Sequence, residues 1–101
     1  MRVGDLYQNL NLINNHKITK IVSNSKDAVV GCLFVAIKGY TNNGEDYIEE
    51  AITKGAKTIV TTSNYETNKN INVIHVKDSK KELGRILKKM YPKVNKNFKW
   101  I

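Results

Sequence analysis

Residues 32–37, Cys-Leu-Phe-Val-Ala-Ile, form an unbroken apolar run that constrains the fold more than any other stretch of the chain. A strand with one solvated face alternates apolar and polar residues, and this run does not alternate. It therefore predicts a central strand of an α/β sheet that is covered on both faces. Short polar side chains crowd both ends of the run, with Ser23, Asn24 and Ser25 before it and residues 41–43 after it.

The spacing of apolar residues predicts the other elements of this sheet. Alternating or β-branched runs indicate strands at residues 17–22, 57–62 and 71–76. Helical spacing predicts a helix over residues 3–12, a second between Asn43 as N-cap and Gly55 as the stop, and a third between an N-cap at Asp78 or Ser79 and Pro92. Together these elements predict one three-layer α/β domain, in which helices flank a mostly parallel or mixed sheet of about four to five strands.

Length and composition are those of one globular domain. The chain has 101 residues, of which 41% are hydrophobic. No apolar run approaches the roughly 20 residues that span a bilayer, and the first residues lack the apolar segment of a secretory signal. We therefore expect no membrane partner and a cytoplasmic location. Cys32 is the single cysteine and lies in the apolar run, which favours a small buried side chain over a disulfide or a metal ligand.

The net charge of +8 is concentrated near the end of the chain. Residues 78–101 contain eight lysines and arginines but only two acidic residues, Asp78 and Glu82. Such a cluster permits binding of nucleic acid, yet it is also typical of a solvated helix face in a lysine-rich chain. No aromatic residues are interleaved with the lysines of residues 80–89, so the solvated face is favoured and nucleic acid is not the expected partner.

Several common chemistries lack their motifs here. No Gly-x-x-x-x-Gly-Lys-Ser/Thr loop is present, so no cofactor is predicted for this chain. His16 and His75 stand alone, which predicts no metal site. Neither Ser23 nor Ser25 has a histidine in a suggestive position, so no catalytic residue is assigned. Acidic residues such as Glu50 are expected on a solvated helix face.

The remaining candidate is a binding site formed by the two polar segments. Ligands of open α/β sheets bind beyond the carboxyl ends of strands, and both segments follow predicted strands. If those strands are parallel neighbours, the segments face one crevice. Backbone amides near Gly39 and Gly44, the Ser25 hydroxyl and the Lys26 ammonium would then hold a diphosphate, and Tyr40 would lie against a flat base. A purely structural role for these turns stays open.

Short motifs follow one another in a distinctive order: Ser25-Lys26, then residues 31–40 as Gly-Cys-Leu-Phe-Val-Ala-Ile-Lys-Gly-Tyr, then Gly44, Tyr47-Ile48 and Gly55-Ala56. This order resembles the N-terminal domain of Mur ligases of the MurE type. In that family, the motif Asp-Ser-Arg is followed by Gly-Asp-Leu-Phe-Val-Ala. A loop that contains Asp-Gly comes next, then Tyr/Phe-Ile and finally Gly-Ala. The resemblance covers nearly the whole chain. The sequence departs from the pattern at Asn24, Lys26, Cys32 and Asn43.

The resemblance implies a ligase that adds meso-2,6-diaminopimelate or L-lysine to UDP-N-acetylmuramoyl-L-alanyl-D-glutamate in peptidoglycan synthesis, with a role in cell wall biogenesis, cell shape and cell division. Residues 1–101 would be the first domain, which holds the UDP part of the precursor. The central domain, which uses ATP and Mg²⁺, and the amino-acid-binding C-terminal domain would be absent, so the isolated chain is expected to be inactive. The implied partners are UDP-N-acetylmuramoyl-dipeptide and the remaining Mur ligase domains.

The resemblance also assigns site residues by position. Ser25 matches the motif serine that contacts the nucleotide, and Ser23 lies where a neighbouring uridine contact is expected. Tyr40, Thr41 and Asn42 match the loop that lines the uracil and ribose. The expected UDP site thus consists of Ser23, Ser25, Lys26, Tyr40, Thr41 and Asn42. Three alternatives remain: a MurF-type ligase that adds D-alanyl-D-alanine, a small basic nucleic-acid-binding module, and a structural remnant without a working site.

Overall fold

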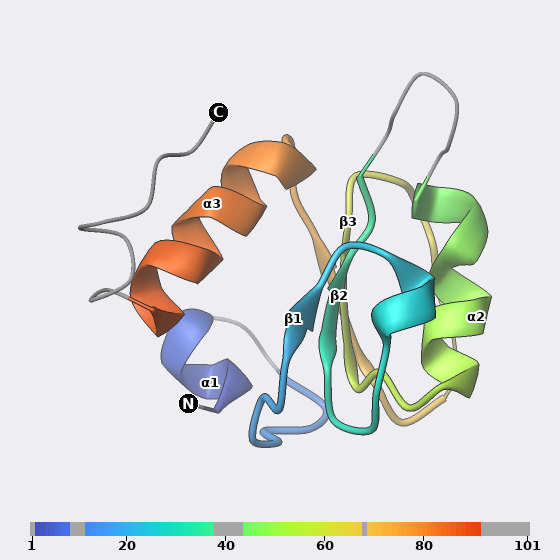
Figure 1. Ribbon diagram of the computed structural model, residues 1–101, viewed down its shortest axis with the longest axis horizontal. Helices are drawn as coiled ribbons and strands as arrows, with labels where there is room; N and C mark the ends of the chain where they lie inside the picture. Colours follow the sequence, from blue (N-terminus) through green and yellow to red (C-terminus); the bar gives the residue numbers. More distant parts are fainter. Residues whose placement is uncertain (1, 9–11, 38–43, 68, 92–101) are drawn as a thin grey trace.

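The computed structural model describes residues 2–8, 12–37, 44–67 and 69–91 (Figure 1). Within them, four parallel strands form one sheet in the order β1 (Ile21–Val22), β2 (Leu33–Val35), β3 (Thr58–Thr61) and β4 (Asn72–His75). The helices are α1 (Val3–Leu6), α2 (Ile48–Thr53) and α3 (Ser79–Met90), with two short 3-10 turns, η1 (Ser25–Asp27) and η2 (Gly44–Tyr47). This architecture confirms the predicted α/β fold.

The sheet lies between two helical layers, with α2 on one face and α1 and α3 on the other (Figure 1). Successive side chains of a strand point to opposite faces. Phe34 pairs with Ile59, and both pack with α2, whereas Val35 pairs with Val60, and both pack with α1 and α3. All four side chains are fully buried. The apolar run is therefore covered on both faces, as its composition predicts.

The prediction that the apolar run is a central strand is confirmed. β2 lies between β1 and β3, although its regular pairing is confined to Leu33–Val35. Cys32 and Ala36, just outside the paired residues, are also fully buried. Burial raises the pKa of the Cys32 thiol above its ordinary value, which agrees with a small packing side chain rather than a reactive thiolate.

Two elements near the start of the chain are shorter than predicted. The first helix ends at Leu6, because the backbone of Tyr7 leaves the helical conformation, and residues 9–11 of the predicted helix lie outside the described residues. The first strand is regular only over Ile21–Val22. Lys17 instead forms an antiparallel bridge with Arg2, so the start of the predicted strand pairs outside the parallel sheet.

The predicted end of α2 and the predicted start of α3 are confirmed. Gly55 follows the C-cap of α2 with a φ of +115°, a conformation that favours glycine. The prediction of Asn43 as the N-cap of this helix is wrong, because α2 begins at Ile48 with Tyr47 as its N-cap, and the residues before it, Gly44–Tyr47, form the 3-10 turn η2. At the start of α3, the Asp78 side chain accepts a hydrogen bond from the Lys81 amide at 3.1 Å, which selects Asp78 over Ser79 as the N-cap.

A buried polar network ties the segment before β1 to the amino ends of β3 and β4. The side-chain oxygen of Asn72, Oδ1, accepts hydrogen bonds from the backbone amides of Ile13 and Asn14, at 2.8 and 3.0 Å. Its amide group donates to the Asn14 carbonyl at 2.6 Å and to the Thr58 hydroxyl at 3.1 Å. A ring nitrogen of His16 lies 2.6 Å from the same hydroxyl. His16 therefore has a structural role, and burial lowers its pKa.

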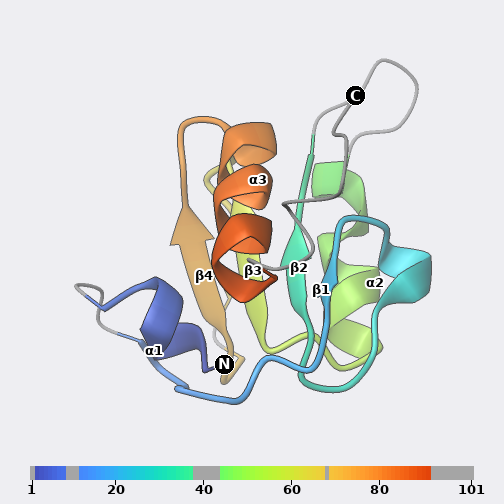
Figure 2. The same ribbon diagram turned by 60° about the vertical axis from the view of Figure 1, so that its left-hand side comes forward.

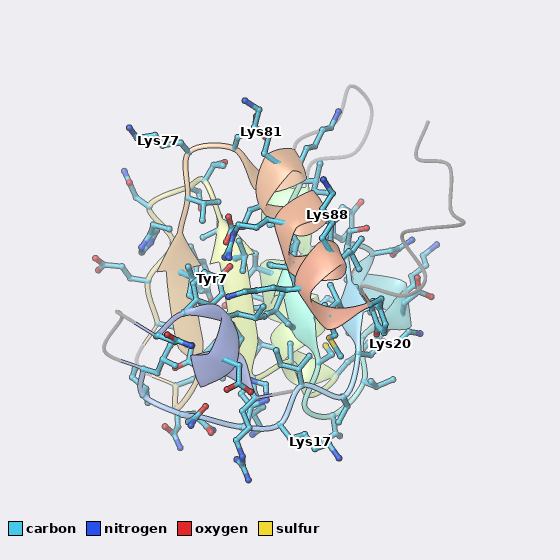
Figure 3. All side chains as sticks on the ribbon, turned by 90° about the vertical axis from the view of Figure 1, so that its left-hand side faces the viewer. Tyr7, Lys17, Lys20, Lys77, Lys81 and Lys88 are labelled. Carbon is cyan, nitrogen blue, oxygen red and sulfur yellow. The ribbon has the colours of Figure 1, made fainter. Side chains whose placement is uncertain are left out.

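A second side-chain cluster joins α1 to α3. The Tyr7 hydroxyl, at the end of α1, donates a hydrogen bond to the Glu82 carboxylate, and Arg85 donates two more at 3.1 and 2.6 Å. The Arg85 guanidinium also lies 5.2 Å from the centre of the Tyr7 ring, and Figure 3 shows Tyr7 beside α3. The bonds from Arg85 and Tyr7 lower the pKa of Glu82, while burial and Glu82 raise that of Tyr7.

Gly84 and Gly55 provide a matched test of this backbone. A Cβ at Gly84, inside α3, would meet no atom within 4 Å, so Gly84→Ala is expected to stabilise the protein by about 0.5–1 kcal/mol. Gly55→Ala is expected to destabilise the protein by about 1–3 kcal/mol from the strain of its positive φ alone. In addition, the new Cβ would lie 2.6 Å from the Val30 Cα. Urea unfolding followed by circular dichroism measures both changes. A stabilising Gly55→Ala substitution would contradict the described turn.

The Glu82 cluster predicts a pH dependence of stability. Because the folded state lowers the pKa of Glu82 below its ordinary value of 4.5, the carboxylate stabilises the fold above that value, and this contribution is lost as the pH falls through the lowered pKa. Glu82→Gln should therefore lower the free energy of unfolding at pH 7. The difference from the unaltered protein should shrink between about pH 5 and pH 3. A difference that stays constant over this range, measured by urea unfolding, would refute the contribution of the charge.

Candidate functional site

A pocket of about 380 Å³ lies at the carboxyl edge of the sheet. Residues 23–26, directly after β1, form one part of its wall, and Phe34 and Ile37, from β2 and the residues after it, form another. Tyr47, at the end of η2, completes the lining. The pocket thus occupies the edge where ligands of open parallel sheets bind.

The structure places part of the predicted site in this pocket. β1 and β2 are parallel neighbours, with Val22 paired to Phe34, so the condition for a shared crevice at their carboxyl ends is met. Ser23, Ser25 and Lys26 all line the pocket. The other predicted residues, Tyr40, Thr41 and Asn42, lie outside the described residues, and their place in the site stays a prediction.

Local hydrogen bonds fix the polar wall as a tight turn. The Asn24 side chain accepts a hydrogen bond from the Lys26 amide at 2.9 Å, and the Asn24 carbonyl accepts one from the Asp27 amide at 2.9 Å. The Ala28 amide donates to the Ser25 carbonyl at 3.2 Å. An asparagine in place of the family's aspartate retains the side-chain oxygen that caps such a turn. The departure at position 24 is therefore compatible with the local fold.

A side-chain contact attaches this turn to α2. The Ser25 side chain is buried, and its hydroxyl donates a hydrogen bond to the Glu50 carboxylate. Lys54 lies 3.9 Å from the same carboxylate, and its ammonium also approaches the Lys26 carbonyl at 3.5 Å. Figure 2 shows η1 lying beside α2. Glu50 is exposed, as expected, but it also positions the polar wall, a role that helical spacing alone did not indicate.

The Ser25–Glu50 contact limits what the serine offers to a ligand. A hydroxyl has one proton and two lone pairs. With that proton donated to Glu50, the Ser25 oxygen can only accept, so it suits a hydroxyl or N–H group of a ligand. The Ser23 and Lys26 side chains are exposed and can donate to anionic oxygens.

The rest of the lining is apolar or aromatic. Phe34 and Ile37 adjoin the polar wall, and Tyr47 remains 40% exposed. Sequence reasoning missed these three as lining residues. It placed Phe34 and Ile37 in the buried apolar run and Tyr47 in the helix predicted between Asn43 and Gly55. The arrangement suits a ligand that has both a flat ring and a charged or hydroxylated part.

The basic residues of α3 lie on the other side of the sheet from η1 and α2. Figure 3 shows Lys81 and Lys88 of α3, and Lys77 shortly before this helix, pointing away from the protein.

The described residues contain no cluster of three or more histidine, cysteine, aspartate or glutamate side chains that could hold a metal ion. Among the described helices, none has both the length and the apolar character needed to cross a membrane.

These features define an open parallel α/β domain with a polar and aromatic pocket at the carboxyl edge of its strands. A profile described as "Mur ligase family, catalytic domain" matches residues 17–96. The chain belongs to the Mur ligase family.

Two curated relatives are named UDP-N-acetylmuramoyl-L-alanyl-D-glutamate--2,6-diaminopimelate ligase, which confirms the resemblance to ligases of the MurE type. The protein from Clostridioides difficile (strain 630) is 30% identical over 103 residues, covering 97% of this chain and 21% of the relative. The protein from Rickettsia prowazekii (strain Madrid E) is 38% identical over 90 residues, covering 88% of this chain and 18% of the relative. The chain therefore spans about a fifth of the length of these relatives.

Similarity extends to ligases of the MurF type. The UDP-N-acetylmuramoyl-tripeptide--D-alanyl-D-alanine ligase of Rickettsia prowazekii (strain Madrid E) is 32% identical over 92 residues, covering 91% of this chain and 20% of that protein. The crystal structure of MurF ligase from Thermotoga maritima in complex with ADP superposes with a TM-score of 0.58 and 31% identity. That alignment covers 71% of this chain and 17% of the MurF chain.

The contact between η1 and α2 yields a direct test. Glu50→Ala removes the acceptor of the Ser25 hydroxyl, so the turn should open more often, and the Asp27 and Ala28 amides should exchange with solvent about ten times faster. Hydrogen–deuterium exchange followed by NMR measures this rate. Glu50→Gln, which keeps an acceptor oxygen, and Glu66→Ala, at an exposed glutamate outside both elements, serve as controls. Equal exchange in Glu50→Ala and the unaltered protein would refute the positioning role.

Proposed function

We propose that this chain is the UDP-recognition domain of a Mur ligase that adds meso-2,6-diaminopimelate or L-lysine to UDP-N-acetylmuramoyl-L-alanyl-D-glutamate in peptidoglycan synthesis. One observation carries the proposal: the motif residues Ser25 and Lys26, together with Ser23, line a pocket at the carboxyl edge of β1 and β2. Its volume falls within the range of about 300–1,000 Å³ that is usual for small-molecule sites.

The chemistry of the wall agrees with a nucleoside diphosphate. The Lys26 ammonium supplies a positive charge for the diphosphate, although as a point charge it fixes orientation less than the family's arginine would. Ser25 accepts a hydrogen bond from a ribose hydroxyl or a base N–H, since its own proton is donated to Glu50. Tyr40, Thr41 and Asn42 are proposed to complete the site from the loop after β2.

In this proposal, residues 1–101 form a single domain that is not catalytic alone. The sequence has no Gly-x-x-x-x-Gly-Lys-Ser/Thr loop for ATP, and the chain spans about a fifth of its relatives. The residues present therefore do not fit ATP with Mg²⁺, and we assign those groups to the central domain of a longer ligase. The partners of the chain are then the UDP-linked precursor and the remaining Mur ligase domains.

A ligase of the MurF type is the second candidate, because a protein named for D-alanyl-D-alanine addition is 32% identical to this chain. The 38% identity to a diaminopimelate ligase from the same organism favours the first candidate. A ligase assay on the protein from the complete reading frame separates them. The assay offers meso-2,6-diaminopimelate, L-lysine and D-alanyl-D-alanine separately, and turnover with the dipeptide alone would select the MurF type.

The proposal predicts where UDP binds to this chain. In a titration followed by amide NMR signals, UDP should shift the signals of residues 23–26 and 40–44. Lys26→Ala should weaken binding about ten-fold, because it removes the charge nearest the diphosphate. Lys81→Ala, on the other side of the sheet, should leave the affinity unchanged. Shifts confined to α3, with a steep salt dependence of oligonucleotide binding, would instead favour a nucleic-acid-binding module.

A further inference from the structure

The pocket contains an aromatic side chain that neither the motif pattern nor the composition assigned to it. We propose that Tyr47 is a stacking surface for the pyrimidine ring of the bound nucleotide, in addition to the contact expected of Tyr40. This inference rests on the proposed UDP-binding function and adds a named residue to it. Tyr47 lies outside the polar motif segments and reaches the pocket from the end of η2.

Exposure distinguishes Tyr47 from the other aromatic residue of the lining. Stacking requires an accessible ring face. Phe34 is 0% exposed, because its ring is covered by the core between the sheet and α2, whereas Tyr47 is 40% exposed. Within the described lining, Tyr47 is thus the aromatic residue with surface that a ligand can reach.

The backbone holds Tyr47 in place. Tyr47 is the N-cap of α2, and Ile48, the next residue, is 1% exposed and packs in the core with Phe34 and Ala51. A ring attached to such an anchored backbone loses little freedom when a ligand binds, because a tyrosine side chain has only two rotatable angles. The position therefore favours a preformed surface for a flat ring.

The polar wall comes from a different element and provides different chemistry. Residues 23–26 belong to η1 and the residues before it, and they supply hydroxyl groups and the Lys26 ammonium. Tyr47 supplies a ring face from η2. A nucleoside diphosphate needs both kinds of surface, since its base is flat and its diphosphate is anionic. Tyr47 should consequently affect binding of the base and leave binding of the diphosphate unchanged.

Isothermal titration of the chain with UDP and, separately, with inorganic pyrophosphate tests this division. Tyr47→Ala and Tyr47→Leu should each weaken UDP binding about ten-fold, because stacking on an aromatic ring is lost, and should leave pyrophosphate binding unchanged. Tyr47→Phe keeps the ring and should bind UDP with the affinity of the unaltered chain. Tyr91→Ala is the matched control, because Tyr91 is 38% exposed and caps α3 on the other side of the sheet. Circular dichroism confirms that each variant folds.

Each outcome decides the inference. Unchanged UDP affinity in Tyr47→Ala overturns it, and so does a ten-fold loss in Tyr47→Phe, which would make the hydroxyl rather than the ring responsible. A Tyr47→Leu variant that binds UDP normally would reduce the role of Tyr47 to apolar packing and also overturns it. If the unaltered chain binds UDP at residues 23–26 in any of these cases, the proposed function stands. If the unaltered chain does not bind UDP, both fail.

Discussion

Burial of both faces of β2 is the constraint on which the rest of the structure depends. Phe34 packs toward α2 and Val35 toward α1 and α3, and complete burial of such a side chain contributes about 1.5–3 kcal/mol. A strand in this position needs a helical layer on each face and a partner on each edge, which β1 and β3 provide. Because its side chains are committed to the core, the exposed polar groups of the pocket come from residues 23–26, which follow β1.

Hydrogen bonds hold the short polar segment at the carboxyl edge of the sheet in a defined turn. Parallel pairing of β1 with β2 brings residues 23–26 to the same edge as the end of β2. Asn24 closes the turn, and the Ser25 hydroxyl attaches it to Glu50 on α2. The same helix begins at Tyr47, so α2 positions both the polar and the aromatic parts of the pocket. A change in α2 would therefore alter both parts of the pocket.

Most of the fold was predictable because buried residues recur along the sequence with the spacing of a helix or a strand. The apolar run at residues 32–37 marked β2, and Asp78 and Gly55 marked helix ends through their own side chain or backbone. The first helix was predicted too long, because Tyr7 leaves the helical conformation and its hydroxyl binds Glu82, 75 residues away. The first strand was also predicted too long, because Lys17 pairs with Arg2 outside the parallel sheet. The local spacing of apolar residues does not reveal contacts between residues that are far apart in the sequence. The predicted serines and Lys26 do line the pocket. The contribution of Tyr47 was not predicted, because this residue fell in a predicted helix and its helical spacing is that of a core residue.

The sequence by itself determined the α/β class, the family and the polar segment after β1, because periodicity and the order of short motifs are properties of neighbouring residues. Tertiary structure alone decided that Ser25 gives its proton to Glu50 and that Tyr47, rather than Phe34, is the exposed aromatic residue of the pocket lining. Both facts depend on how η1, η2 and α2 pack against the sheet. Packing joins side chains that are far apart in the sequence, and it determines which atoms remain accessible to a ligand.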